Sequence, residues 1–476
     1  MIVLGYLLGI AYALLCLGAA LLLYKLGLPK KYTRKLVHIL VGFEWIILYY
    51  TMGPGVHFLA VCLFFLLLLS VSYFKNLMPM ISSDADNAPG TVYYAVAMSG
   101  VAALGCFLPS VMLPFGVGIF CTSIGDGVAG VVGQALSGRS PKIYGNKTLA
   151  GTVANFASSS LSALVMSLFT PIDLSLLECM LIGIFSAGIE LVVGFGLDNI
   201  VITWSVTALT YAFMYFDAIS SYIVPIILTP IIIAVVLEKR ALTPLGTATA
   251  VVLDALVSVS LGNAGFVILC SFLFGSVIID KFKKRKKTHG RIEETAKGDC
   301  RDAIQVLANG AVPTALSVAF AICGSPILLA AYVAALAEAF ADTAASGLGA
   351  FARRVVDPFR MKRCENGISG GMSLIGTLSA LVGAFLFAAL GLAFSFYDLS
   401  VMFLVGTFAF LGTVLDSLLG SLVQVKYRCD VCGRVTERRL HCGTETRKFS
   451  GIAFVNNDLV NFLSGAFAAL LALLFA

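Results

Sequence analysis

The stretch VMLPFGVGIFCTSIGDGVAGVVGQAL (111–136) is long and apolar and carries a single charged residue, Asp126. A helix of about 20 mostly apolar residues is long enough to cross a bilayer. Similar runs recur along the chain, which is 59% hydrophobic and 12% charged, whereas soluble domains carry about 25% charged residues. The short alternating strands of a membrane barrel are not visible. The sequence therefore predicts an all-α polytopic membrane protein.

By this length rule we expect about sixteen transmembrane helices. They are expected near residues 2–24, 35–50, 54–74, 91–110, 111–136, 149–170, 177–194, 199–216, 219–237, 243–261, 263–280, 303–322, 325–346, 371–395, 399–424 and 455–475. The first run has neither a basic start nor a small-residue cleavage site, so we interpret it as a retained span and not as a signal peptide.

The basic residues lie almost entirely in loops that follow odd-numbered spans. Because basic loops stay in the cytoplasm, this pattern predicts cytoplasmic basic loops and both termini outside, with a prokaryotic cell membrane as the expected location. The run KFKKRKK (281–287) fits a topology anchor near anionic lipid better than a nucleic-acid-binding segment. We therefore expect no nucleic-acid partner.

Short segments recur in the same order in the two halves of the chain, which predicts a parallel repeat. The pairs are RKLVHILVG (34–42) with RDAIQVLANG (301–310), GDGVAGVVG (125–133) with ADTAASGLG (341–349), KTLAGT (147–152) with MSLIGT (372–377), IELVVG (189–194) with LDSLLG (415–420), and DNIV (198–201) with DLVN (458–461). Each match is weak alone, but the shared order is not expected by chance. By the charge rule the corresponding spans run in the same direction, unlike those of inverted-repeat transporters.

Each half thus offers three carboxylates and one arginine, which we expect at the cytoplasmic ends of spans. They are Asp126, Glu190, Asp198 and Arg34 in the first half, and Asp342, Asp416, Asp458 and Arg301 in the second. Carboxylates in membrane segments are costly and usually functional, and converging acids suit a cation such as Mg²⁺. Glycine-rich turns present N–H groups to anions, and Lys or Arg neutralises a transferring phosphoryl group. The set favours phosphoryl or nucleotidyl transfer to a lipid head group.

Each of these residues also has a structural interpretation. Asp126 alone could cap a helix or pair with Arg34, and the glycines of 127–133 could be small residues at a helix contact. His38 could be an ordinary hydrogen-bonded histidine. The repeated order favours a functional role more for the carboxylates than for the glycines.

At this point the sequence resembles two known families. The first half, about 30 to 215, resembles the dolichol kinase and phytol kinase group of CTP-dependent lipid kinases, through RKLVH (34–38), DNAPGTVYY (86–94), GDGVAGVVG (125–133), KTLAGT (147–152), and Glu190 with GLDN (196–199). The second half, about 240 to 476, resembles the membrane family that includes plant phytyl-phosphate kinase, through QVLANG (305–310), ADTAAS (341–346), GISGGMSLIGT (367–377), LDSLLGSLVQ (415–424) and NNDLVN (456–461). We therefore expect two domains, 1–238 and 239–476, the second with a cysteine-bearing loop at 426–448.

The resemblance implies a bifunctional lipid kinase. A prenyl alcohol such as phytol or geranylgeraniol would be phosphorylated with CTP and Mg²⁺, and the prenyl phosphate would then become the diphosphate. The donor nucleotide of the second half is less specified. The implied Mg²⁺ ligands are Asp126, Glu190, Asp198, Asp342, Asp416 and Asp458. The implied contacts to phosphate charge are Arg34, Lys147 and Arg301, and His38 or a carboxylate would accept the alcohol proton.

The implied nucleotide- and phosphate-binding residues are small or polar. They are Gly125, Gly127, Thr148, Gly151, Thr152, Asn199, Asn309, Gly370, Gly371, Ser373, Gly376, Thr377 and Asn457. The chain departs from the second family's pattern at Gly347, where that family usually has Glu. Glu338 lies one helical turn before Asp342 on the same face and could compensate.

The segment CDVCGRVTERRLHC (429–442) carries Cys429, Cys432, His441 and Cys442. A CxxC knuckle followed by His or Cys is typical of zinc sites. However, four ligands within this segment is tight, and adjacent residues such as His441 and Cys442 rarely both reach one ion. A structural Zn²⁺ and a reduced cytoplasmic hairpin therefore stay alternative interpretations.

Two other functions compete with the lipid kinase. A lipid cytidylyltransferase would use the same CTP and Mg²⁺ but would leave CMP on the lipid, and the long basic–acidic signature of phosphatidate cytidylyltransferases is not present. A membrane transporter would place its polar residues near the midplane and not at one face.

Overall fold

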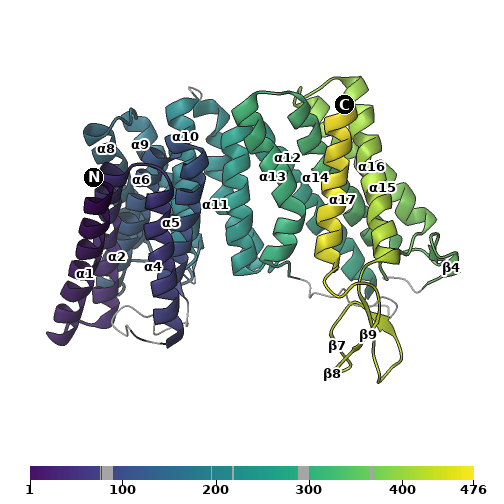
Figure 1. Ribbon diagram of the computed structural model, residues 1–476, viewed down its shortest axis with the longest axis horizontal. Helices are drawn as coiled ribbons and strands as arrows, with labels where there is room; N and C mark the ends of the chain where they lie inside the picture. Colours follow the sequence, from purple (N-terminus) through teal and green to yellow (C-terminus); the bar gives the residue numbers. More distant parts are fainter. Residues whose placement is uncertain (76, 78–88, 195, 217–218, 288–299, 365–367) are drawn as a thin grey trace. The chain divides into compact units, whose positions relative to one another are not determined.

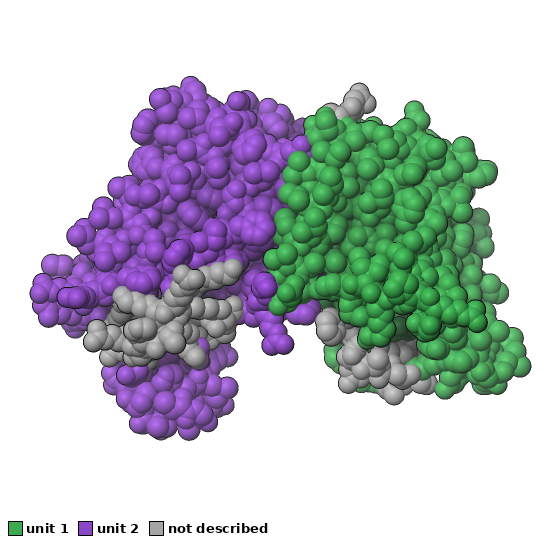
Figure 2. Space-filling view, turned by 180° about the vertical axis from the view of Figure 1, so that it is seen from behind, with its two compact units in different colours: residues 1–238 green, residues 239–476 purple. Residues whose placement is uncertain are grey.

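The computed structural model describes residues 1–75, 77, 89–194, 196–216, 219–287, 300–364 and 368–476. Helices dominate these residues, and thirteen of the helices are long and apolar enough to cross a membrane (Figure 1). The chain divides into two compact units, unit 1 (Met1–Glu238) and unit 2 (Lys239–Ala476) (Figure 2). A polytopic helical membrane protein, as the composition predicts, is the class that this architecture defines.

The structure has thirteen candidate spans, whereas the sequence predicts sixteen, and this difference has physical causes. Helix α12 (Pro244–Lys287) replaces two expected spans, because helix continues on both sides of a kink at Gly262, where φ is 59° and ψ is −150°. A straight helix over its apolar part would be about 54 Å long, well beyond the roughly 30 Å hydrocarbon core. Two further expected spans are α9 (Leu176–Val192), which has 17 residues, and α10 (Asp198–Tyr215), which is interrupted by polar residues. Neither is among the thirteen.

Unit 1 combines its helices with one short β-hairpin. Its further elements are α1 (Ile2–Lys25), α2 (Lys30–Gly42), α3 (Glu44–Met52), α4 (Val56–Lys75), α5 (Gly90–Phe107), α6 (Met112–Phe120), the π-helical turn η2 (Cys121–Asp126), α7 (Gly127–Ala135), β1 (Lys142–Tyr144), β2 (Lys147–Thr148), α8 (Leu149–Phe169) and α11 (Ile223–Glu238). Helix α10 is largely enclosed, with buried residues along its length, and it contacts α5, α6, α9 and η2.

Unit 2 is organised around one alanine-rich helix. Its further elements are α13 (Ala303–Cys323), α14 (Ile327–Gly349), β3 (Val356–Asp357), β4 (Lys362–Arg363), α15 (Leu374–Ala393), α16 (Leu399–Leu422), β5 (Lys426–Arg428), β6 (Val435–Thr436), β7 (Leu440–His441), β8 (Thr444–Glu445), β9 (Arg447–Ser450) and α17 (Asn457–Phe475). Helix α14 contacts α12, α13, α15, α16 and α17. Its small side chains let these neighbours approach closely, and Tyr332 fixes α14 to α12 by donating to the Gly265 carbonyl oxygen at 2.9 Å.

Large apolar side chains cover the outer faces of both units. Leu14, Leu67, Leu168 and Leu386 are 64%, 65%, 69% and 63% exposed, respectively. Exposed apolar surface on this scale is unusual for a soluble monomer, but it matches a lipid environment. The polar residues, in contrast, gather inside the units and at the ends of helices.

Polar side chains also fix the start of several helices. Thr148 accepts a hydrogen bond from the Gly151 N–H at the start of α8, and Ser373 accepts one from the Gly376 N–H at the start of α15. Such caps satisfy backbone donors that have no partner within the helix. Two of the predicted phosphate-binding residues, Thr148 and Ser373, are therefore helix caps in this fold.

Candidate functional site

Asp126 lies at the end of the π-helical turn η2 and is buried. Lys35 of α2 donates from Nζ to Asp126 Oδ2 at 2.6 Å and to the Asp126 carbonyl oxygen at 3.3 Å. π-Helical turns are rare and occur frequently at functional sites. The turn thus presents the predicted aspartate to a buried ammonium group.

His38 lies on the same face of α2 as Lys35. Its Nε2 is 3.1 Å from the Thr122 carbonyl oxygen and 3.5 Å from Asp126 Oδ2. Because both neighbours are acceptors, we assign the proton of the neutral ring to Nε2, which leaves the lone pair on Nδ1. The ring also packs edge-on against Tyr94, with 5.2 Å between centroids. This orientation makes Nδ1 the atom of His38 that can accept a proton.

A second ion pair joins the β1–β2 hairpin to α9. Lys147 Nζ donates to Glu190 Oε1 and interacts electrostatically with Asp198 and Asp126. Although burial opposes its charged form, these three carboxylates raise the pKa of Lys147 above its usual value. Asp198, at the start of α10, also interacts with Lys35. Unit 1 therefore gathers three predicted carboxylates and two lysines into one cluster.

Arg34, the predicted phosphate contact, immediately precedes Lys35 on α2 and interacts electrostatically with His38. The cation that forms the ion pair with Asp126 is Lys35. The sequence could have identified Lys35 as a site residue. Residues three apart on a helix share a face, and Lys35 precedes His38 by three residues.

The glycine-rich segments bring two helices of unit 1 into close contact. A Cβ atom on Gly151 would lie 3.1 Å from the Ala129 carbonyl oxygen, 3.3 Å from Gly133 Cα and 3.3 Å from Thr148 Oγ1. These distances are tighter than most real Cβ contacts. Helices α7 and α8 can therefore meet at this depth only with glycine.

Unit 2 contains the same contact at the repeat-related positions. A Cβ atom on Gly376 would lie 3.1 Å from the Ala345 carbonyl oxygen, 3.4 Å from Gly349 Cα and 3.1 Å from Ser373 Oγ. Helices α14 and α15 thus pack as α7 and α8 do, with matching partners. The agreement in three-dimensional detail supports the repeat that the short sequence matches suggest.

Other predicted phosphate-binding residues also have local structural contacts. A Cβ on Gly125, Gly127 or Gly371 would collide with a neighbouring side chain, as expected for glycines at close contacts. The Asn199 amide donates to the Gly90 and Gly196 carbonyl oxygens at 3.0 and 3.1 Å. These contacts account for the small or polar residue type by themselves, and phosphate binding by these residues stays a prediction.

The remaining polar candidates lie at helix ends. Thr152 donates to the Thr148 carbonyl oxygen at 3.2 Å, and Asn309 donates to the Gln305 carbonyl oxygen at 3.2 Å. The backbone N–H of Thr377 donates to the Ser373 carbonyl oxygen at 2.8 Å. The backbone of Arg301 pairs with the segment before α12, donating to Ala241 at 3.1 Å and accepting from Thr243 at 2.8 Å.

Three carboxylates of unit 2 interact within its interior. Glu338 and Asp342 lie one turn apart on α14, and Glu338 interacts electrostatically with Asp342 and with Asp416 of α16. Ser464 and Asn461 of α17 donate to Asp416 Oδ2 at 3.3 and 3.2 Å. Glu338 is 1% exposed, and its Oε1 has no hydrogen-bond partner among the described residues. A buried carboxylate oxygen without a partner is costly and suits a bound cation.

Asp458, the third predicted carboxylate of unit 2, is buried at the start of α17. The Asn456 amide donates to its Oδ2 at 3.5 Å. The Asn457 carbonyl oxygen accepts from the Asn461 amide at 3.0 Å, so Asn457 is linked to the residue that contacts Asp416. The start of α17 thereby approaches the Asp416 carboxylate on α16.

The turn around Gly370 is held between α16 and the cysteine-bearing loop (426–448). Gly370 has a φ of 86°, and a Cβ there would lie 2.5 Å from the backbone nitrogen of Ser421. The Ser369 N–H donates to Glu437 Oε1 at 3.1 Å, and Lys426 Nζ donates to the Ser369 carbonyl oxygen at 2.7 Å. Glu437 and Lys426 belong to the loop, which therefore fixes the position of this turn.

Within that loop, Cys429, Cys432, His441 and Cys442 come together, with one potential ligand atom from each lying within 4.8 Å of all the others. Among the described residues this is the tightest group of His, Cys, Asp and Glu. The carboxylates of the two units are spread more widely.

Glu44 is one of the intramembrane acids that the sequence analysis did not single out. Glu44, the first residue of α3, is 4% exposed, and its Oε1 has no hydrogen-bond partner among the described residues. It interacts electrostatically with Cys62 and Tyr94. An acid inside an apolar span was the available signal, but Glu44 lacks a counterpart in the repeat.

Comparison with known proteins identifies the family. Residues 227–469, just over half of the chain, match the family described as Integral membrane protein DUF92. The chain belongs to this family of integral membrane proteins.

Individual relatives are more distant. An uncharacterized membrane protein of Methanocaldococcus jannaschii is 31% identical over 163 residues, which are 34% of this chain and 65% of the relative, just under two thirds of its length. An uncharacterized membrane protein of Synechocystis sp. is 27% identical over 198 residues, 41% of this chain and 77% of the relative. A phytol kinase of Synechocystis sp. is 28% identical over 199 residues, 41% of this chain and 84% of that enzyme. No solved structure matches the chain.

Proposed function

We propose that this protein is an integral-membrane lipid kinase with two active sites, one in each unit. Unit 1 would phosphorylate a prenyl alcohol such as phytol or geranylgeraniol with CTP, and unit 2 would phosphorylate the resulting prenyl phosphate to the diphosphate. The observation that carries the proposal is the partly buried cluster of Lys35, Asp126, Lys147, Glu190 and Asp198 in unit 1. Similarity to a phytol kinase supports the choice of substrate.

In the first reaction, the alcohol oxygen attacks the γ-phosphorus of CTP. The new oxygen–phosphorus bond forms as the bond between the γ-phosphorus and its bridging oxygen breaks, and CDP leaves. Lys35 and Lys147 would stabilise charge on the phosphates, because fixed cations in a buried site lower the cost of that charge. Nδ1 of His38 would take the alcohol proton, with Asp126 holding the opposite ring nitrogen in place.

We propose Mg²⁺ as the cation of unit 1. Three carboxylates and two lysines interact in the cluster among the described residues, and carboxylate oxygens are preferred ligands of this ion. Asp126, Glu190 and Asp198 would hold it. When bound, Mg²⁺ would neutralise charge on the nucleotide phosphates.

In the second reaction, a phosphate oxygen of the prenyl phosphate attacks the γ-phosphorus of a nucleoside triphosphate. The bond from the γ-phosphorus to its bridging oxygen breaks, and the nucleoside diphosphate leaves. The acceptor is already ionised, so no residue has to remove a proton. Asp342, Asp416 and Asp458 with Glu338 would hold the cation, and the unpartnered Oε1 of Glu338 supports this assignment. Glu338 would thereby replace the carboxylate that the second family usually carries at the position of Gly347.

We further propose that both sites face the cytoplasm of a prokaryotic cell. The placement of basic loops supports this orientation through the positive-inside rule. CTP is a cytoplasmic metabolite, so a CTP-dependent enzyme needs its nucleotide site on that side.

The test uses the full-length protein purified in detergent, with Mg²⁺, γ-labelled CTP and either phytol or geranylgeraniol. Lipid products are separated for wild type, Asp126→Asn and Asp342→Asn, with Asp398→Asn as a matched control, because Asp398 is an exposed helix cap that Asn can replace. We expect the wild type and the control to make labelled diphosphate. Asp342→Asn should stop at the monophosphate, and Asp126→Asn should act only on supplied prenyl monophosphate.

Two outcomes would replace the proposal. A lipid product that carries cytidine, detected with α-labelled CTP because the γ-label would leave with the diphosphate, would make the protein a lipid cytidylyltransferase. Absence of any phosphorylated prenol, combined with substrate uptake into vesicles without nucleotide turnover, would make it a membrane transporter.

A further inference from the structure

The cysteine-bearing loop (426–448) lacks an apolar core of its own. Its strands project beyond the N-terminal start of α17 (Figure 1). Two of its larger apolar side chains, Val431 and Leu440, are 63% and 65% exposed. Strands of two to four residues bury too little apolar surface to offset the entropy lost on ordering. Small segments of this kind usually need a disulfide or a metal ion.

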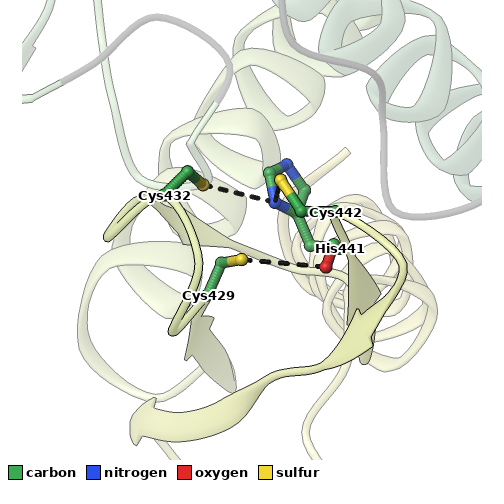
Figure 3. A group of neighbouring side chains, drawn as sticks. All are labelled: Cys429, Cys432, His441 and Cys442. Atoms are coloured by element: carbon green, nitrogen blue, oxygen red, sulfur yellow. Dashed lines mark hydrogen bonds between the residues drawn. The ribbon is translucent and has the colours of Figure 1, made fainter.

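Two turns of this loop point their side chains at one another (Figure 3). Cys429 and Cys432 lie in the turn between β5 and β6, where the Gly433 N–H donates to the Cys429 carbonyl oxygen at 2.9 Å. His441 is the last residue of β7, and Cys442 follows it in the turn between β7 and β8. A pair of knuckles that contribute two ligands each is the arrangement of structural zinc sites.

The distances between the side chains fit a tetrahedral ion. His441 Nδ1 lies 3.5 Å from Cys432 Sγ and 3.3 Å from Cys442 Sγ. A Zn²⁺ ion with Zn–S near 2.3 Å and Zn–N near 2.05 Å requires N···S separations of about 3.6 Å and S···S separations of about 3.8 Å. All four ligand atoms lie within 4.8 Å of one another, so a small contraction completes the site.

The backbone explains how adjacent residues can both reach one ion. Cys442 has a φ of 52°, and Gly443 follows with a φ of 78°. A non-glycine residue in this region is uncommon and costs free energy. The chain reversal at Cys442 turns its sulfur back toward His441 Nδ1. The two adjacent residues can therefore both reach one ion, which the sequence spacing argued against.

We propose that Cys429, Cys432, His441 and Cys442 bind one structural Zn²⁺, and that this ion holds the loop in the form that positions the turn around Gly370. All four positions of the ion would be filled by the protein, which leaves no open position for catalysis. The inference does not depend on the proposed kinase activity.

The consequence for unit 2 follows from Glu437, which lies between the two knuckles in the chain. Its carboxylate accepts from the N–H and the hydroxyl of Ser369 and interacts electrostatically with Asp416. Without the ion, the two knuckles separate and Glu437 loses its fixed position. By fixing Glu437, the zinc site would hold the predicted phosphate-binding turn around Gly370 in place.

The test starts with full-length protein, free of histidine tags and purified under reducing conditions without chelator. Elemental analysis should find one Zn²⁺ per chain in the wild type and close to none in Cys432→Ser. Cys323→Ser, which removes an exposed cysteine at the end of α13, is the matched control and should keep the ion. Replacement of zinc by Co²⁺ should give the visible absorption of a tetrahedral thiolate site in wild type and control.

A second readout follows the loop itself. Amide hydrogen exchange over 426–448 and at Ser369 should increase on removal of the ion, while exchange in unit 1 stays unchanged. Wild-type protein without zinc but with all thiols reduced would overturn the proposal. A disulfide within the group, or Cys432→Ser with wild-type zinc content, would also overturn it.

Discussion

Lys35 Nζ and Asp126 Oδ2 lie 2.6 Å apart, and their side chains are 14% and 7% exposed. The ion pair joins α2 to the π-helical turn within unit 1. Removing either member of a buried pair leaves the other charge without compensation. The pair therefore combines a structural role with the proposed phosphate-binding role, and variants must separate the two.

Replacing Lys35 should affect both stability and the first phosphorylation. Lys35→Met leaves Asp126 uncompensated, so we expect a loss of about 3 kcal/mol in unfolding free energy, together with loss of prenol phosphorylation. Lys35→Arg keeps the charge and should retain stability but lose part of the rate. Melting temperature and initial rate are measured for each variant.

The matched control is Lys31→Met, because Lys31 is an exposed lysine on the same helix. It should leave stability and rate unchanged. Wild-type prenol phosphorylation in Lys35→Met would remove Lys35 from the proposed site.

Loss of the proposed base should affect only one of the two reactions. His38→Gln should slow phosphorylation of the alcohol by about 10²–10⁴-fold, whereas conversion of supplied prenyl monophosphate should continue, because its acceptor is already ionised. The two rates are measured separately on the same preparation. His57→Gln, at an exposed histidine paired with Tyr6, is the control. Equal loss of both activities in His38→Gln would contradict a base role.

The close helix contact in unit 1 predicts a steric effect. Gly151→Val forces a branched side chain against the backbone of α7, so we expect a cost of about 1–3 kcal/mol and a lower melting temperature. Gly18→Val places the same side chain on α1 where no atom lies within 4 Å, and it should be neutral. Equal melting temperatures for the two variants would show that α7 and α8 are not held as described.

Glu338 should matter for the second reaction alone. Glu338→Gln removes the buried charge that would help to hold Mg²⁺, so conversion of the monophosphate should require a higher Mg²⁺ concentration. The protein itself should become no less stable, because the variant removes a carboxylate from a group of like charges. The measurement is the Mg²⁺ dependence of the rate. An unchanged dependence would leave Glu338 outside the metal site.

Lys147 gives a prediction about pH. The surrounding carboxylates raise its folded-state pKa above the unfolded value of about 10.4. Its contribution to stability is therefore complete below the unfolded pKa and is lost only as pH rises through the folded value. Lys147→Gln should lower the melting temperature equally at about pH 8 and about pH 9, where the surrounding carboxylates are ionised. Lys142→Gln, on exposed β1, is the control, and an effect of Lys147→Gln that disappears at the higher pH would contradict the assignment.

Helix patterning predicts much of the fold because lipid demands long apolar runs. The kink at Gly262 falls where the sequence separates two expected spans. The packing of Gly151 on Ala129 and Gly133, repeated by Gly376 on Ala345 and Gly349, follows the matched segments. Short apolar runs such as α9 are harder to assign, because 17 residues suit either a buried helix or a crossing.

The site was less predictable, because side-chain partners depend on the rotation of each helix. Arg34 stands opposite Arg301 in the repeat, which directed attention away from Lys35, the residue that contacts Asp126. The adjacency of His441 and Cys442 argued against a shared ion, since sequence spacing does not reveal the positive φ at Cys442. The rotation of α2 decides the contact of Lys35 with Asp126, and the backbone conformation at Cys442 decides where its sulfur points.

The π-helical turn at Cys121–Asp126 has a consequence for how the two repeats can diverge. It holds one residue more than an α-helical turn would, whereas the matching segment of unit 2 lies within the α-helix α14. Deleting a single residue from the turn would return this segment to α-helical winding and change the backbone pairing around Asp126. The two units therefore differ in helical winding at this position, so Asp126 and Asp342 sit on different backbone geometries.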